Sequence, residues 1–113
     1  MESKTVIAAL SALAHETRLA IFRALVRAGP EGLAAGELAT TLNVAPSTLS
    51  HHLMLLDHAG IVTTRRQQRY IYYSVIHATV RNLLSFLIDD CCDGAPELCG
   101  LSRVDRCQDI AHA

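Results

Sequence analysis

The chain has 113 residues, which is enough for one domain around one hydrophobic core. Half of the residues are hydrophobic, which excludes a disordered chain, and only 4% are aromatic, so aliphatic side chains must fill the core. The formal net charge of -1 does not indicate a nucleic-acid binder, but three arginines are concentrated between residues 65 and 69. Because local charge determines contact with phosphates, DNA binding is not excluded.

The N-terminal sequence and the hydropathy pattern indicate a cytoplasmic protein without a membrane attachment. No apolar stretch reaches the roughly 18–20 residues that a membrane span requires. Residues 1–4 lack the basic region and the long apolar run of a signal peptide. All four cysteines lie between residues 91 and 107. In the cytoplasm such a cluster indicates metal binding or redox chemistry before structural disulfides.

Apolar residues at helical spacing predict three helices in the first part of the chain. The first helix has one apolar face, formed by Val6, Ile7, Leu10, Leu13 and Ala14. A second helix begins near residues 15–17 and stops near Gly29-Pro30, where glycine and proline end the pattern. The third covers Leu33 to Leu42.

A fourth helix follows a three-residue turn at positions 43–45. It begins at Pro46, because proline suits the first helical turn, and Ser47 or Thr48 can satisfy donors that are exposed there. It ends at Ala59-Gly60, where glycine fits a left-handed cap. Its core-facing residues are Leu49, Leu53 and Leu56.

The rest of the predicted domain is a hairpin and a last helix. Residues 61–65 and 70–75 are β-branched or aromatic runs around the polar connection 66–69, which predicts two paired strands. The last helix carries a continuous apolar stripe of Val80, Leu83, Leu84, Leu87 and Ile88. The fold class is therefore mainly α with a small β-hairpin wing, a winged helix-turn-helix domain over residues 1–90, followed by a cysteine-bearing tail at 91–113.

The third and fourth helices have the proportions of a helix-turn-helix motif, in which the start of the second helix faces base edges in the major groove. The hairpin tip would reach phosphates or the minor groove. The candidate DNA-binding residues are Ser47, Thr48, Ser50, His51, His52, Arg65, Arg66, Gln67, Gln68 and Arg69. Each alone has an ordinary explanation as a helix cap or a solvated surface residue, so the prediction depends on their combination.

Three segments resemble the ArsR/SmtB family of metal-responsive repressors. Residues 13–21, LAHETRLAI, are similar to its N-terminal signature, residues 44–53, VAPSTLSHHL, to its recognition helix, and residues 56–70 to its helix end and wing. The resemblance covers roughly residues 5–90. It implies a homodimer, paired through the first and last helices, that binds an imperfect palindrome in double-stranded operator DNA. The apolar stripes on those helices give the dimer an independent physical reason.

Two ligand positions common in this family are absent from the sequence. The third helix has Gly36-Glu37-Leu38-Ala39 and no thiol at the place of one arsenic site. The last helix has His77 at its start, but no histidine at its far end to complete a zinc site. The remaining candidate ligands are the cysteines that follow the last helix.

Trivalent arsenic and antimony favour three sulfur ligands in a pyramid, which Cys91, Cys92 and Cys99 can supply. With Cys107 the chain also offers four thiolates to zinc or cadmium, and adjacent cysteines can form a strained redox disulfide. Similar C-terminal clusters occur in arsenite-responsive members of the family, and this resemblance favours As(III) or Sb(III) as the inducer, with Cys107 as a bystander.

Metalloid binding next to the last helix is expected to change the distance between the two recognition helices, and so to release DNA. A thiol oxidoreductase is the alternative of a different class. It needs an activated cysteine beside a base or at a helix N-terminus, whereas these cysteines lie among acidic residues. We therefore expect a protein that is not an enzyme. A winged helix that only binds other proteins is a further alternative.

Overall fold

The computed structural model describes residues 1–92, and eight elements follow one another in it. Five are helices: α1 (Ser3–Leu13), α2 (Glu16–Ala28), α3 (Ala35–Leu42), α4 (Pro46–His58) and α5 (His77–Cys92). Three are strands: β1 (Leu33–Ala34), β2 (Val62–Gln67) and β3 (Tyr70–Val75), in one antiparallel sheet of order β1-β3-β2. The predicted fold class, a mainly helical winged helix-turn-helix, is confirmed.

The local sequence explains where the helices begin and end. His15 caps α2, because its Nδ1 accepts the N–H of Thr17 at 3.1 Å. α3 ends at Asn43 in the left-handed conformation, which asparagine tolerates, and α4 begins with a proline in its first turn, as predicted. The chain therefore makes a tight helix-turn-helix between α3 and α4.

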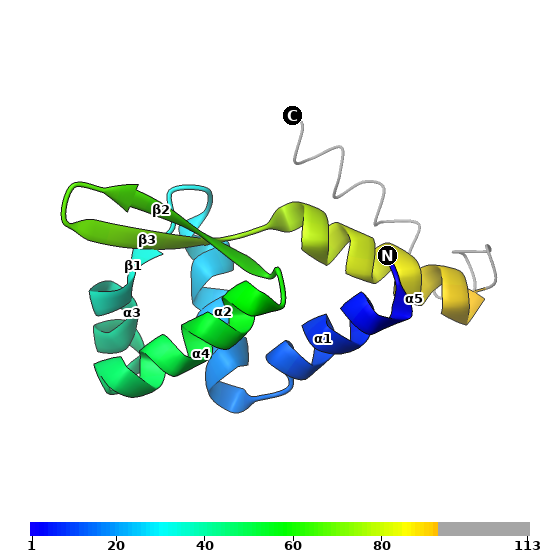
Figure 1. Cartoon of the computed structure of the whole chain (residues 1–113), viewed down its shortest axis with the longest axis horizontal. Coiled ribbons are helices and arrows are strands. Elements are labelled where there is room, and N and C mark those ends of the chain that lie inside the picture. Colours follow the sequence, from blue (N-terminus) through cyan, green and yellow to red (C-terminus); the bar gives the residue numbers. More distant parts are fainter. Residues whose placement is uncertain (93–113) are drawn as a thin grey trace.

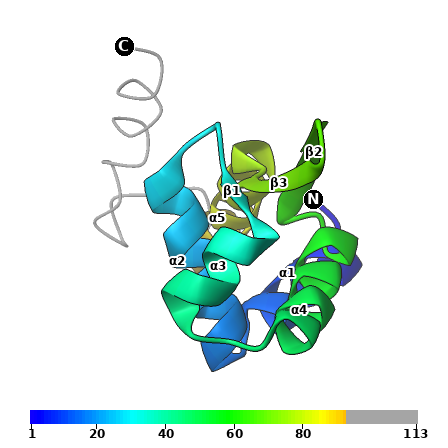
Figure 2. The ribbon, with the colours of Figure 1, turned by 90° about the vertical axis from the view of Figure 1, so that its left-hand side faces the viewer.

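One core holds the elements together. The largest fully buried side chains come from α2, α3, α4 and the start of β2: Ile21, Leu25, Leu38, Leu49, Leu53, Leu56, Ile61 and Val62. The β2–β3 hairpin extends over the end of the molecule that contains α3, while α1 and α5 lie at the opposite end (Figure 1). Seen from the hairpin end, α3 and α4 are at the front (Figure 2).

Three sequence-based expectations are corrected by the structure. The third helix begins at Ala35 rather than Leu33, because Leu33 and Ala34 pair with Tyr73 and Tyr72 as strand β1. The hairpin connection is shorter than residues 66–69: both strands continue to Gln67 and from Tyr70, and Gln68 turns with a φ of 57°.

The apolar face expected on α1 is in fact divided between two faces. Val6, Ala9 and Ala12 are buried in the core, whereas Ile7 is 63% exposed and Leu10 is 41% exposed. A helix of this kind covers the core with one side and keeps a second apolar side on the surface.

No single helix within residues 1–92 has both the length and the apolar character to cross a membrane. Taken together, α1 and α2 would be long and apolar enough, but the chain bends by 96° at their junction.

Gly32 is the position where the sheet leaves no room for a side chain. Its φ is +74°, and a Cβ there would overlap the carbonyl oxygen of Tyr73 on the neighbouring strand. We predict that Gly32→Ala costs at least about 1–3 kcal/mol of unfolding free energy from the backbone conformation alone, with the overlap added to it. Urea denaturation measures this cost.

Gly36→Ala is the matched control, because a Cβ at Gly36 meets nothing within 4 Å. Alanine favours helix over glycine, so this variant should be neutral or more stable by up to about 1 kcal/mol. Equal stability of the two variants would mean that β1 does not pair closely with β3.

Candidate nucleic-acid interface

The start of α4 presents a polar, exposed face that the core holds in place. Ser47, Thr48, Ser50 and His51 are all exposed, while the leucines of the same helix are buried. The N-cap residue, Ala45, provides no side-chain hydrogen bond, so the amides of the first turn remain available to an outside acceptor such as a phosphate. Four of the five candidate residues on this helix therefore face outward.

His52 is the fifth candidate, and here the expectation was wrong about its exposure. Its side chain is only 7% exposed and lies on the core side of α4. Positions 49, 52, 53 and 56 share one helical face, so His52 follows the leucines inward. Its partners are protein groups, and it does not belong to the outward-facing set.

Arg18 of α2 connects His52 to the end of α1. One guanidinium nitrogen lies 3.2 Å from His52 Nδ1, and Nε donates to the carbonyl oxygen of Ala12 at 2.6 Å. The ring of His15 stacks at a tilt of 39° on His52, with 4.6 Å between centroids. No local pattern in the sequence indicates this contact, because residues 18 and 52 are 34 positions apart.

The wing carries the second set of candidate residues, and all five are exposed. Arg65 is nevertheless engaged within the protein. Its guanidinium donates to Gln67 Oε1 and, at 3.0 Å, to the carbonyl of Glu31, and lies 4.9 Å from the centre of the Tyr72 ring. Arg65 therefore fastens the hairpin to the loop before β1, while Arg66 and Arg69 extend from the outer part of the wing.

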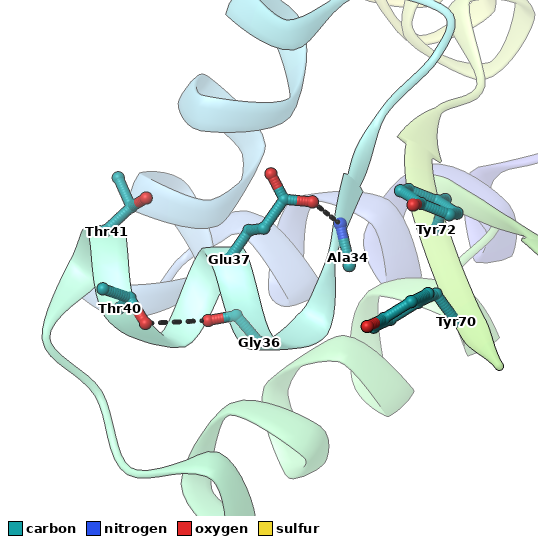
Figure 3. A pocket seen from close by; sticks show the side chains of 7 residues that line it. All are labelled: Ala34, Gly36, Glu37, Thr40, Thr41, Tyr70 and Tyr72. Atoms are coloured by element: carbon teal, nitrogen blue, oxygen red, sulfur yellow. Dashed lines mark hydrogen bonds between the residues drawn. The ribbon is translucent and has the colours of Figure 1, made fainter.

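A cavity lies between α3 and β3, beside the wing (Figure 3). Tyr70 and Tyr72 form its strand side, and Glu37 lies on its helix side. The polar groups here are used locally: Glu37 accepts the N–H of Ala34 at 3.2 Å, and the Thr40 hydroxyl donates to the Gly36 carbonyl at 3.0 Å. These bonds stabilise the start of α3 and connect it to β1.

The predicted metalloid ligands lie at and beyond the end of the described chain. Cys91 and Cys92 are the last two residues of α5, whereas Cys99 and Cys107 lie outside the described residues. Among residues 1–90, whose side chains the structure describes, no group of three histidine, cysteine or acidic side chains is arranged to hold a metal ion.

Comparison with known proteins agrees with this geometry. A family model described as a helix-turn-helix domain matches residues 13–65. The nodulation protein NolR of Rhizobium meliloti is 40% identical over 80 residues, covering 71% of this chain and 63% of NolR. A transcriptional repressor SmtB homolog of Synechocystis is 37% identical, over 70% of this chain and 58% of its own length. The chain thus spans less than two thirds of these relatives.

Solved structures with the same fold match more completely. HlyU from Vibrio cholerae has a TM-score of 0.63 and 31% identity, covering 81% of this chain and 99% of HlyU. An ArsR-like transcriptional regulator from Rhodococcus has a TM-score of 0.70 and 25% identity, covering 89% of this chain and 92% of the regulator. The homodimeric winged helix-turn-helix domain Mb0332 from Mycobacterium bovis has a TM-score of 0.64 and 27% identity, covering 77% of this chain and 80% of the Mb0332 domain.

An outward-facing α4 beside a β-hairpin wing, together with these matches, defines a DNA-binding winged helix-turn-helix transcriptional regulator and not an enzyme. Within that class, the chain belongs to the ArsR/SmtB family.

The two surfaces should contribute differently to DNA binding. Replacing Arg66 and Arg69 with alanine should weaken binding to all duplexes and lower the salt slope by about 1 for each lost phosphate contact. Ser50→Ala should instead change which sequences are preferred. Fluorescence anisotropy at several salt concentrations distinguishes these effects, and Lys4→Ala on α1 is the control for a loss of charge alone. An unchanged salt slope in the arginine variant would remove the wing from the interface.

Proposed function

We propose that the protein is a cytoplasmic repressor that binds double-stranded operator DNA as a homodimer and leaves it when As(III) or Sb(III) binds to Cys91, Cys92 and Cys99. The observation that carries the DNA-binding part is the arrangement in which the polar face of α4 and the basic hairpin lie at the same end of the molecule (Figure 1). The SmtB homolog of Synechocystis, a repressor by name, supports the direction of regulation.

The homodimer is supported by apolar surface at the opposite end. α1 and α5 pack on each other there, and both leave large apolar side chains exposed. Besides Ile7 and Leu10, these include Leu84 at 44% and Leu87 at 39% exposure. Exposed apolar faces on adjacent helices mark an interface, and a second copy supplies the same faces by two-fold symmetry. The homodimeric Mycobacterium bovis domain has this fold.

The dimer can be tested on α5. Leu84→Glu places a charge without a partner in the proposed interface, which costs several kcal/mol and should yield monomers in analytical ultracentrifugation. Leu87→Glu should act in the same way. Ser85→Glu is the control, because Ser85 is exposed and polar on the same helix. If the Leu84 and Leu87 variants remain dimeric, the interface lies elsewhere.

Residues 91–113 form the proposed sensing tail. The proposal is supported by its position in the chain: α5, which carries the exposed leucines, continues to Cys92, so two of the three ligands belong to the helix of the proposed interface. Three thiolates match the coordination that trivalent arsenic and antimony prefer. A Halobacterium salinarum relative that is 43% identical over 67 residues is named ArsR and assigned to an arsenical resistance operon.

Release follows if the metalloid binds better to a dimer whose recognition helices no longer match the operator. Successive major grooves on one face of DNA repeat at about 34–36 Å, so a change in the spacing of the two α4 helices weakens binding. The effect is reciprocal, and operator DNA must lower metalloid affinity by the same factor. α5 is the element that transmits the change, because it belongs both to the interface and to the cysteine segment.

Single cysteine variants test the sensing site. Cys91→Ser, Cys92→Ser and Cys99→Ser each remove one bond to the metalloid, so each variant should still bind DNA but no longer be released by arsenite. Cys107→Ser is the matched control and should respond as the wild type does. DNA binding with and without arsenite, measured by anisotropy, gives the answer.

Other outcomes point to the alternative ligands. An equal requirement for Cys107 would favour a four-thiolate zinc or cadmium site. Release by an oxidant, without arsenite, would favour a thiol redox switch. If all four variants remain inducible by arsenite, the sensing site is elsewhere and only the DNA-binding part of the proposal stands.

A further inference from the structure

We propose that His15, Arg18 and His52, here called the histidine cluster, position the recognition helix for DNA, and that protonation of His52 weakens DNA binding. This inference rests on the DNA-binding role of α4. It adds positioning residues behind the interface and makes the protein sensitive to acid, independently of the cysteines.

The contact between Arg18 and His52 fixes the protonation state of His52. A guanidinium has only donors, so His52 Nδ1, at 3.2 Å from it, must accept with a lone pair. The ring is therefore neutral, with its proton on Nε2. A second proton on Nδ1 would remove the hydrogen bond and place two cations at that distance.

Arg18 links the contact with His52 to the end of another helix. Its Nε donates at 2.6 Å to the Ala12 carbonyl, which is one of the last carbonyls of α1 and lacks a partner within that helix. The guanidinium therefore connects three elements: the end of α1, its own helix α2, and the middle of α4. Loss of the bond to His52 removes this polar contact between α4 and the other two helices, while Leu49, Leu53 and Leu56 still pack in the core, so the orientation of α4 changes rather than its attachment.

His15 adds a second imidazole whose Nδ1 accepts a hydrogen bond. This atom accepts the Thr17 N–H as the N-cap of α2, and the ring lies against His52 with 4.6 Å between centroids. Two neighbouring imidazoles thus both use a lone pair in the folded arrangement. A proton on His52 Nδ1 breaks its bond to Arg18 and is repelled by the guanidinium.

The surroundings of His52 disfavour its charged form. Burial lowers the pKa of His52 from its ordinary 6.5, and the charges of His15, Arg18 and His51 lower the pKa further. These three are the groups that act on it from the α1–α2 junction, from α2 and from α4 itself, while Glu37 of α3 is bonded to Ala34 instead.

The sign of the pH effect follows from this lowered pKa. The unfolded or undocked state takes up the proton first as the pH falls. The docked arrangement is therefore fully stable above about pH 6.5 and loses stability as the pH falls below it.

His51 acts in the opposite direction, which makes it a useful control. It is exposed on the DNA-facing side, with its ring centroid 5.7 Å from that of His52. Protonation of His51 adds a positive charge next to phosphates and strengthens DNA binding. The charge on His51 therefore cannot cause the proposed decrease in affinity at low pH, and the decrease should not become smaller when His51 is removed.

The experiment uses the full chain and a labelled duplex selected by the wild-type protein from a random DNA library at pH 7.5. Anisotropy at constant ionic strength gives the dissociation constant between pH 7.5 and 5.5. We expect a loss of affinity of up to about tenfold for the wild type and for His51→Asn, which is the most that one proton on a group of ordinary pKa 6.5 can supply over this range. His52→Asn keeps an acceptor near the position of Nδ1 and does not titrate, so its affinity should not fall over this range. A flat wild-type profile, or the same profile in His52→Asn, overturns the proposal.

An NMR titration of the wild type tests the cluster without any variant and without DNA. Long-range ¹H–¹⁵N spectra should show His52 as the Nε2–H tautomer at pH 7.5, with a pKa below its ordinary 6.5. A proton on His52 Nδ1 at pH 7.5, or a pKa of His52 that is not lowered, would contradict the proposal even if His52→Asn failed to fold. If no duplex is bound at pH 7.5, the DNA-binding role fails instead, and the NMR result still decides the protonation state of the cluster.

Discussion

The recognition helix α4 must bury one face in the core and expose the other face to solvent. The rest of the structure depends on this constraint. Leu49, Leu53 and Leu56 are 0–1% exposed, and each buried leucine contributes about 1.5–3 kcal/mol. Rotating α4 by one residue position would expose them. The core therefore determines that Ser47, Ser50 and His51 point outward, and it fixes the direction in which they point.

The two ends of the molecule have different surfaces because they have different partners in the proposed function. The end with α4 and the hairpin exposes the arginines of the wing and the polar start of α4, whereas α1 and α5 carry exposed leucine and isoleucine side chains at the other end. Between them is the core, with α2 at its centre and Arg18 as a polar contact from α1 to α4. A change at α5 has a continuous packed route to α4 through α1.

Periodicity predicted most of the fold, because long amphipathic helices and a hairpin leave regular patterns. It missed β1, since a strand of two residues has no pattern of its own and forms only because Leu33 and Ala34 pair with β3. His52 was placed outside because it is polar, although its spacing from Leu49 and Leu56 indicated the core face. His52, bonded to Arg18, and Glu31, bonded to Arg65, each lie 34 positions from their arginine and could not be found from local sequence.

In the strand order β1-β3-β2, β2 forms one edge of the sheet. It is much longer than β1 at the other edge, which spans only two residues. An unpaired edge invites the same edge of another molecule to add to the sheet, and charged side chains are a common protection against this. Arg65 and Arg66 lie on that edge. Their positive charges therefore oppose edge-to-edge pairing of two molecules, and replacing either arginine with an apolar residue would leave that edge less protected.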